Sequence, residues 1–223
     1  MRSAGPRQTL LQGRMNWVLP TGHGKPVPHS TSAADRPLTL DEKLELLRAA
    51  RQALVNHLQG GEPIAGASES PVLRRVRSTF VTLRRRDTGE LRGCRGDCTA
   101  RHPLLSSVMR MAIASGTGDS RFPPVTLEEV PSLAIEISVL GEFFPVEVDA
   151  IEVGRHGLLI VRGPTLGILL PQVPLAYGWD RKAFLRALCS KADLPDNAWT
   201  DPAARLFAFE TEWWSESSLA PGG

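Results

Sequence analysis

The chain contains little cysteine, and it lacks both long apolar runs and a strong net charge. The 223 residues include three cysteines, an odd number that argues against a disulfide scaffold and favours free thiols in a reducing compartment. No apolar run approaches the roughly 20 residues that a membrane-spanning helix needs. We therefore expect a soluble, cytoplasmic protein with no membrane contact. The formal net charge of +2 does not by itself suggest nucleic-acid binding.

Common signatures of catalysis and metal binding are also missing. The sequence has neither a glycine-rich phosphate loop nor a serine nucleophile elbow, so nucleotide hydrolysis and ordinary esterase chemistry have no support. Cys94, Cys98 and His102 follow one another at intervals of four residues. Structural zinc sites usually pair cysteines two to four residues apart and take a second pair from elsewhere in the chain. We therefore expect no metal and no cofactor.

The composition of the chain suggests where it is ordered. Residues 1–37 are rich in Gly, Pro, Ser, Thr and basic residues and predict a flexible N-terminal arm. Residues 38–217 are expected to form the domain, because this length is enough for one large domain or two closely packed halves. Residues 218–223 are expected to fray.

Local patterns predict a mixture of helices and strands. Thr39 and Glu42 have the spacing of a capping box, which predicts a helix that ends at Gly60. The same reasoning predicts a helix from Pro103 to Gly116, a short one before Pro131, and one capped by Asp180. Strands are expected as a hairpin on either side of residues 87–89, an alternating strand over 133–140, a hairpin of central strands over 157–170, and a final strand over 205–213. Because there is no strict β-α repeat, the α+β class fits best.

Cys94 is the first candidate for chemistry. If Gly89 closes the first hairpin in a left-handed conformation, Thr82 lies opposite Cys94 and Arg84 lies opposite Arg92. Arg92 and Cys94 would then share one face of the sheet, and the guanidinium would lower the pKa of the thiol and favour the thiolate. The alternative is that Cys94 is a small buried hydrophobe beside packing glycines.

Arginines crowd the stretch around this cysteine. They could attract a phosphate, a carboxylate or an acidic partner, or they could be solvated charges that protect an edge strand from aggregation. No aromatic ladder is interleaved with them, so nucleic-acid binding is not expected. The residues are Arg74, Arg75, Arg77, Arg84, Arg85, Arg86, Arg92 and Arg95.

Several blocks in order resemble one known family. The chain is similar to the AMME chromosomal-region domain family, protein A of the AmmeMemoRadiSam system, from about Thr39 to Glu216. The resemblance implies an α+β fold of two subdomains around a mixed sheet flanked by helices, with the Arg-Gly-Cys segment lining a functional cleft. The chain departs from the family at Arg95 and Asp97. The matching blocks are residues 91–94, Asp119 with 121–123, 135–140, 151–157 and 169–173, followed by Trp179 and Cys189.

The resemblance also implies candidate site residues and partners. Cys94 would be a nucleophile or covalent acceptor, with Arg92 stabilising its thiolate and Glu136 or Asp119 in proton transfer. The alternative is a non-catalytic adaptor that binds a small molecule or peptide, in which Gly93 permits close approach and Arg92 recognises an anion. A Memo-like protein and a radical S-adenosylmethionine enzyme are implied as partners in one pathway. The candidates for substrate binding are Gly93, Asp119, Arg121, Gln172 and His156, the last of which is equally well explained as a loop residue.

Overall fold

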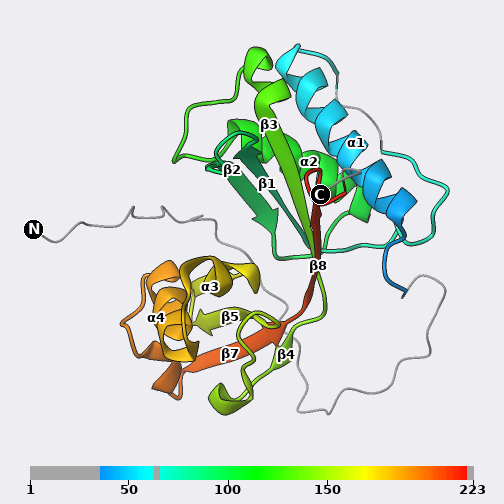
Figure 1. Ribbon diagram of the computed structural model, residues 1–223. Coiled ribbons are helices and arrows are strands. Elements are labelled where there is room, and N and C mark those ends of the chain that lie inside the picture. Colours follow the sequence, from blue (N-terminus) through cyan, green and yellow to red (C-terminus); the bar gives the residue numbers. More distant parts are fainter. Residues whose placement is uncertain (1–35, 63–65, 220–223) are drawn as a thin grey trace, which may run out of the picture. The chain divides into compact units, whose positions relative to one another are not determined.

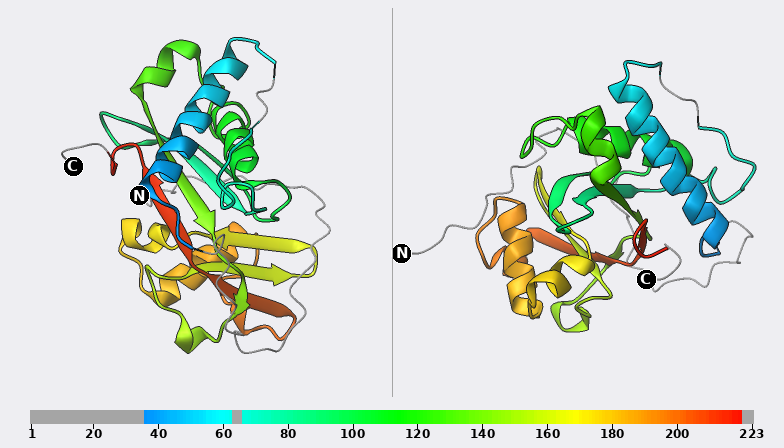
Figure 2. Two further views of the ribbon diagram at one scale, coloured as in Figure 1. Left: turned by 90° about the vertical axis from the view of Figure 1, so that its right-hand side faces the viewer. Right: turned by 45° about the horizontal axis from the view of Figure 1, so that its top comes forward.

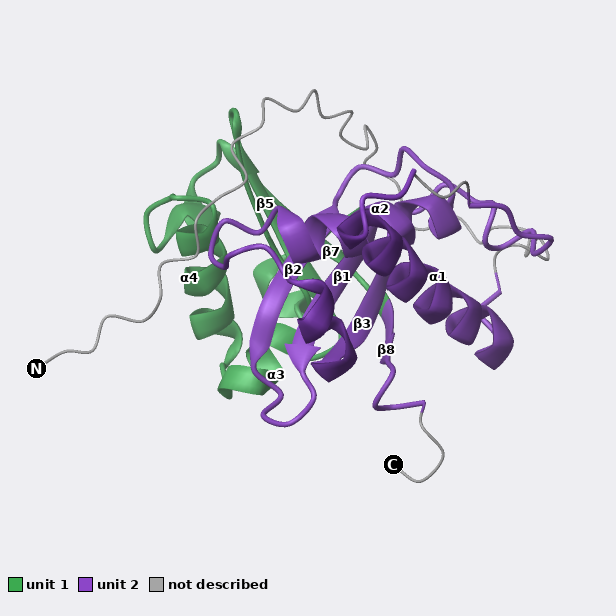
Figure 3. Cartoon of the chain, turned by 90° about the horizontal axis from the view of Figure 1, so that it is seen from above, with its two compact units in different colours: residues 1–22, 141–211 green, residues 23–140, 212–223 purple. Residues whose placement is uncertain are grey.

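The computed structural model describes residues 36–62 and 66–219. Of the N-terminal arm predicted over residues 1–37, all but the last two residues lie outside this part of the chain. The described residues divide into two compact units (Figure 3), unit 1 over residues 141–211 and unit 2 over the described residues before 141 and after 211.

Unit 2 is a four-stranded sheet with two helices on one face (Figures 1 and 2). The strand order is β2-β1-β3-β8, so β2 lies at one edge and β1 and β3 lie in the centre. The strands are β1 (Thr79–Arg85), β2 (Leu91–Asp97), β3 (Leu133–Leu140) and β8 (Thr211–Ser215). The helices are α1 (Leu40–Leu58) and α2 (Leu104–Thr117), and the 3-10 helix η1 (Leu127–Ser132) precedes β3.

The helix ends of unit 2 follow the sequence signals. The Thr39 hydroxyl accepts a hydrogen bond from the backbone N–H of Glu42 at 3.3 Å, and the Glu42 carboxylate accepts one from the N–H of Thr39 at 2.8 Å. This reciprocal pair satisfies two N–H groups that a helix start leaves without partners. The capping box predicted from the sequence is therefore confirmed, and Thr126 and Glu129 form a second one at η1.

The core of unit 2 lies between the sheet and its two helices. The alternating apolar residues of β3 are buried there with Val81 and Leu83 of β1, because side chains in a strand point to opposite faces in turn. The predicted strand over residues 133–140 is confirmed, but it is not half-buried, because every residue in it except Glu136 is buried. The residues between them, which include Thr82 and Glu136, consequently face away from the helices.

Unit 1 combines a second four-stranded sheet with short helices. Its strand order is β4-β7-β5-β6, from β4 (Phe144–Pro145), β5 (Gly157–Arg162), β6 (Thr165–Leu169) and β7 (Ala204–Phe209). Its α-helices are α3 (Gln172–Tyr177) and α4 (Arg181–Lys191), with 3-10 turns η2 (Val148–Ala150) and η3 (Ala198–Thr200). Asp180 caps α4 by accepting a hydrogen bond from the N–H of Ala183 at 2.7 Å, as predicted.

The α+β class is confirmed, and four details differ from the sequence-based expectations. Two antiparallel sheets stand where one mixed sheet was implied. The predicted final strand is two strands, because the chain leaves β7 at Glu210 and enters β8 in the other sheet. β6 is an edge strand and not a central one. Ser218 and Leu219, which were expected to fray, each donate a backbone hydrogen bond to Ser215. Among the helices over residues 36–62 and 66–219, none is both long enough and apolar enough to span a membrane.

Candidate functional site

The register of unit 2 brings Thr82, Cys94 and Glu136 into one row. Thr82 of β1 pairs with Cys94 of β2 on one side and with Glu136 of β3 on the other. Directly opposed residues in an antiparallel sheet point to the same face, so the three side chains share the face that lies away from the helices. The predicted pairing of Thr82 with Cys94 is confirmed. We call this surface the Cys94 face and define it by Thr82, Arg84, Cys94 and Glu136 together with the loop residues Asp119 and Arg121.

A β-bulge separates Arg92 from this face. The register shifts after Leu83, so Arg84 lies opposite Leu91 and not opposite Arg92, which corrects the predicted pairing. A bulge turns the following side chains of a strand to new directions. The buried guanidinium of Arg92 donates two hydrogen bonds to Glu129, at 3.1 and 2.9 Å, and one to the carbonyl oxygen of Pro123 at 3.0 Å. The expectation that Arg92 stabilises a Cys94 thiolate is therefore wrong.

Arg121 is the arginine that acts on Cys94, and it does so while paired with Asp119. Arg121 donates two hydrogen bonds to the buried Asp119 carboxylate, at 2.9 and 2.5 Å. The same carboxylate accepts a hydrogen bond from the backbone N–H of Cys94 at 2.9 Å. Burial acts to raise the pKa of Asp119, but the bonds from Arg121 and from the two backbone N–H groups outweigh it and leave the pKa lowered. Asp119 is thus an ionised anchor that joins the loop to the edge strand β2.

The pKa of the Cys94 thiol is raised above its ordinary value. Burial raises its pKa, and the negative charges of Asp119 and Glu136 act in the same direction. Thr82 donates its hydroxyl hydrogen to the sulfur at 3.3 Å, and this bond and the charge of Arg121 lower the pKa without overcoming the burial. The expectation of a lowered thiol pKa is consequently wrong, because burial outweighs the Thr82 hydrogen bond and the charge of Arg121.

Gly93 serves the packing of helix α2. A Cβ atom at this position would overlap the carbonyl oxygen of Ser115, so only glycine allows β2 and α2 to approach so closely. Ser115 completes the junction, since its hydroxyl accepts a hydrogen bond from the N–H of Arg95 at 2.9 Å and lies 2.7 Å from the carbonyl oxygen of Val81. The close approach that Gly93 permits is to a helix, which corrects its assignment to substrate binding.

His156 and Gln172 belong to unit 1, whereas Cys94 belongs to unit 2. His156 is buried in its own loop, where its Nδ1 accepts a hydrogen bond from the N–H of Glu152 at 3.1 Å and its ring lies edge-on to Phe144. The structure therefore shows His156 as a buried residue that stabilises its own loop. Gln172 is the first residue of α3, directly after Pro171.

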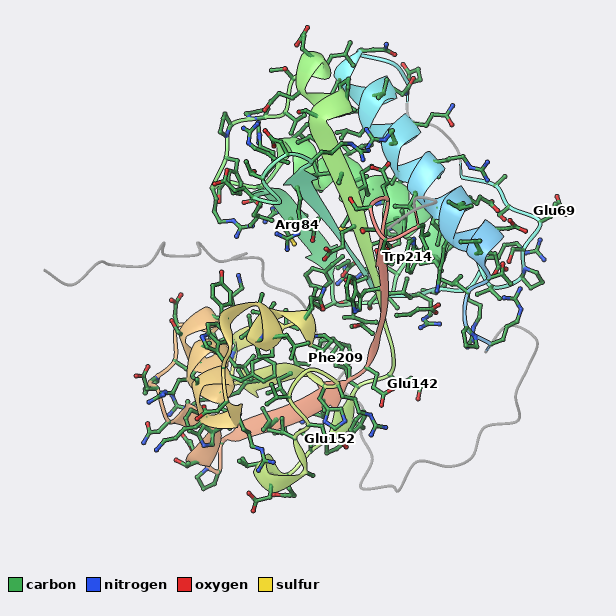
Figure 4. All side chains as sticks on the ribbon, viewed as in Figure 1. Glu69, Arg84, Glu142, Glu152, Phe209 and Trp214 are labelled. Carbon is green, nitrogen blue, oxygen red and sulfur yellow. The ribbon has the colours of Figure 1, made fainter. Side chains whose placement is uncertain are left out.

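Two hollows open on unit 2. The larger, of about 420 Å³, is lined by Arg92 with Leu91, Phe122, Pro123 and Glu129 among others. The smaller, of about 170 Å³, includes Glu136 and Arg84 of the Cys94 face (Arg84 is labelled in Figure 4). The larger hollow therefore lies at Arg92, which the bulge separates from the Cys94 face. The smaller hollow is lined in part by residues of the Cys94 face itself. Over the described residues, no group of three or more His, Cys, Asp and Glu side chains is arranged to hold a metal ion.

Three residues of this region were missed in the sequence. Glu129 was recognised only as a capping residue, although its carboxylate also holds Arg92. In the sequence, Ser115 is only a small polar residue within an apolar helix, and nothing there predicts its contact with β2. The predicted register placed Thr82 opposite Cys94 but did not predict its hydrogen bond to the sulfur. A serine within a helix that faces a strand glycine is the pattern that could have revealed the first of these contacts.

Fold and site together define an α+β protein with a cysteine of raised pKa on the face of an antiparallel sheet that lies away from its helices. Comparisons with known proteins give its family: the AMMECR1 family model matches residues 47–214, and the chain belongs to this family. It is 40% identical to Protein MK0488 of Methanopyrus kandleri, over 80% of this chain and 90% of that protein. It is 39% identical to Protein MJ0810 of Methanocaldococcus jannaschii, over 81% of this chain and 93% of that protein.

A solved structure supports the same assignment. The crystal structure of the uncharacterised protein PH0010 from Pyrococcus horikoshii superimposes with a TM-score of 0.74 at 38% sequence identity. The match covers 78% of this chain and 91% of that protein. The resemblance found in the sequence blocks is confirmed, and with it the α+β fold.

Proposed function

We propose that the protein acts through the Cys94 face, with Cys94 as the nucleophile or covalent acceptor of an enzyme or enzyme component. The observation that supports this most directly is the hydrogen bond from the Thr82 hydroxyl to the Cys94 sulfur at 3.3 Å. A donor on sulfur stabilises the charge that develops there when the thiol loses its proton.

The surrounding charges fit a thiol that is deprotonated during the reaction and not before it. Glu136 is the base we assign, because it shares the row with Cys94 and has a half-buried carboxylate. In this scheme the thiol proton passes to Glu136, and Arg121 stabilises the negative charge that develops on sulfur as the proton leaves. The sulfur electron pair then forms a bond to an electrophilic carbon of the substrate, and the electron pair of the bond that breaks at this carbon moves onto the attached oxygen or leaving group.

The setting of this activity follows the family. We propose a cytoplasmic protein of the AmmeMemoRadiSam system, which works in one pathway with a Memo-like protein and a radical S-adenosylmethionine enzyme. A chain with free cysteines suits a reducing compartment. These are implications of family membership, and they name partners in a pathway without naming the reaction.

The test is covalent capture at Cys94. Wild-type protein, Cys94→Ser and the matched variant Cys98→Ser are incubated with a small-molecule extract, and intact masses are measured before and after denaturation. We expect an adduct on the wild type and on Cys98→Ser, and none on Cys94→Ser. An adduct that survives in Cys94→Ser, or a wild type that stays unmodified, would contradict a covalent role for this sulfur.

The alternative is a non-catalytic module that binds a small molecule or a peptide. The raised pKa of the thiol favours it, since a neutral thiol is a poor nucleophile. In the capture experiment this alternative predicts a compound that is released from both the wild type and Cys94→Ser on denaturation and that leaves no change in covalent mass.

A further inference from the structure

The smaller hollow of unit 2 is rich in arginine for its size. Three successive arginines, Arg84, Arg85 and Arg86, border its volume of about 170 Å³ together with Ser215 and Ser217. Alternation would send neighbouring strand residues to opposite faces. Here the strand β1 ends at Arg85 and the chain turns, with Arg86 donating its backbone N–H to the carbonyl oxygen of Ser132. The turn brings all three residues to the lining of one hollow.

The ion pairs around this hollow are unbalanced. Five guanidinium groups, from Arg51, Arg84, Arg85, Arg86 and Arg92, are joined to three carboxylates, from Glu129, Glu136 and Glu216. Arg51 and Arg86 share Glu216, and Arg85 and Arg92 share Glu129. Asp87 and Glu90 of the hairpin end are exposed to solvent, as Arg86 is, so screening weakens all of these charges alike. Within the ion pairs themselves, five guanidinium groups share three carboxylates.

Arg85 has the weakest hold on its partner. Its guanidinium lies 3.8 Å from Glu129, beyond hydrogen-bond distance, whereas Arg92 lies 2.9 Å from the same carboxylate. The Arg85 side chain is 42% exposed and lines both hollows. Its donors can turn to a ligand without breaking a bond that the fold needs.

We propose that the smaller hollow binds an oxyanion, a phosphate or carboxylate group, of the molecule that reacts at the Cys94 face. Arginine donors in a fork match the geometry of both groups, and serine hydroxyls add further donors. The volume suits one such group and not a whole ligand, since ligand pockets usually run from about 300 to 1,000 Å³. The hollow lies along the same face as the sulfur: Arg84 is two residues along β1 from Thr82, the residue that pairs with Cys94, a step of about 7 Å.

Only the identity of the ligand as a substrate rests on the proposed function, and oxyanion binding is tested separately. The full chain is titrated with sodium phosphate and with sodium acetate at constant ionic strength, and backbone amides are followed by NMR. We expect saturable chemical-shift changes at the backbone amides of Gly89, Ile135 and Ser217. The ion with the lower Kd identifies the bound group as a phosphate or a carboxylate. Arg85→Gln should raise the Kd about tenfold, which corresponds to the loss of one charge-assisted hydrogen bond.

The matched control is Arg110→Gln, which removes the same charge from an exposed position on α2. It should change the Kd less than about twofold, because screened charges at a distance contribute little. Equal weakening by both variants, or no saturable shift at the hollow with either ion, would overturn the proposal. Cys94→Ser should bind the ion like the wild type, so a failed covalent capture and a failed oxyanion site give different results.

Discussion

At the scale of single residues, the pKa of Cys94 is set by burial and by the few charges that act on the sulfur, and not by how many arginines surround it in sequence. Arg92, two positions away, donates hydrogen bonds to Glu129 and Pro123. Arg121, 27 positions away, acts on the thiol but is bound to Asp119. Burial outweighs Arg121 and raises the pKa of the thiol, which disfavours the nucleophilic thiolate until a ligand or a base changes its surroundings.

The Thr82 hydroxyl should contribute measurably to the reactivity of this thiol. Thr82→Val removes the hydrogen bond to sulfur and keeps the shape of the side chain, so the pKa of Cys94 should rise further. A hydrogen bond of about 1 kcal/mol corresponds to a roughly fivefold lower thiolate fraction below the pKa. Alkylation of Cys94 by iodoacetamide, followed against pH by peptide mass spectrometry, should slow by that factor. An unchanged rate would show that the hydroxyl does not act on the sulfur, and Thr117→Val on α2 is the control.

Glu136→Gln should have the opposite effect on the pKa of Cys94. Because the negative charge of Glu136 raises the pKa of Cys94, removing it should lower the pKa and speed alkylation by iodoacetamide below the pKa. The same variant should lose the adduct that the proposed base helps to form. Faster labelling with an unimpaired adduct would remove Glu136 from the proton transfer while leaving its electrostatic effect intact.

At the scale of elements, the β-bulge gives the Arg-Gly-Cys segment three separate duties. Arg92 holds η1, Gly93 admits α2 and Cys94 faces the opposite side of the sheet. The sequence predicted the strand and the pairing of Thr82 with Cys94, because alternation and a turn glycine are local signals. It could not predict the bulge, because the register after Leu83 depends on the loop that supplies Pro123 and Glu129 from about 30 residues away.

The tie between β2 and η1 should be sensitive to acid. The pKa of Glu129 is lowered, chiefly by its hydrogen bonds with Arg92. A carboxyl with a lower pKa in the folded state adds stability above its unfolded pKa of about 4.3, and this stability is lost as pH falls through the folded value. Glu129→Gln should lower the free energy of unfolding by about 2 kcal/mol at pH 7 and by progressively less below pH 4. Urea unfolding at several pH values measures this, and a pH-independent difference would contradict it.

Gly93→Ala should separate packing from chemistry. The added methyl group meets the backbone carbonyl oxygen of Ser115, which moves only if β2 or α2 moves. We expect a loss of about 3 kcal/mol in the free energy of unfolding, at the upper end of the range for overpacked cores. The control is Gly66→Ala, whose methyl group would meet only side-chain atoms of Leu105, Ser106 and Met109. Equal stability of the two variants would show that β2 and α2 are less tightly joined than their contact implies.

At the scale of the whole molecule, the sequence predicted the kinds of element and their order better than their assembly. The capped helices and the alternating strand over residues 133–140 were set by neighbours in the chain. The division of the last predicted strand into β7 and β8 was not, since only Glu210 separates residues 204–209 from 211–215 while they pair in different sheets. Only the pairing with distant strands shows that Glu210 marks the change from one unit to the other.

This division predicts that unit 2 folds without unit 1. Its main hydrophobic cluster runs from Leu38 to Val139 and is completed by Trp214, all within unit 2. A second set of contacts, from Glu216 to Arg51 and to the N–H of Ile135, ties the end of the chain to the same unit. Because β8 lies beside β3 in the sheet, a short Gly/Ser linker in place of residues 141–211 closes a small loop, which costs little entropy. We expect a cooperative unfolding transition and near-ultraviolet circular dichroism from the buried Trp214. The control is Trp214→Phe in the full chain, which should still unfold cooperatively. If it does, and the shortened chain shows neither a cooperative transition nor the circular dichroism signal, the core of unit 2 is not sufficient by itself.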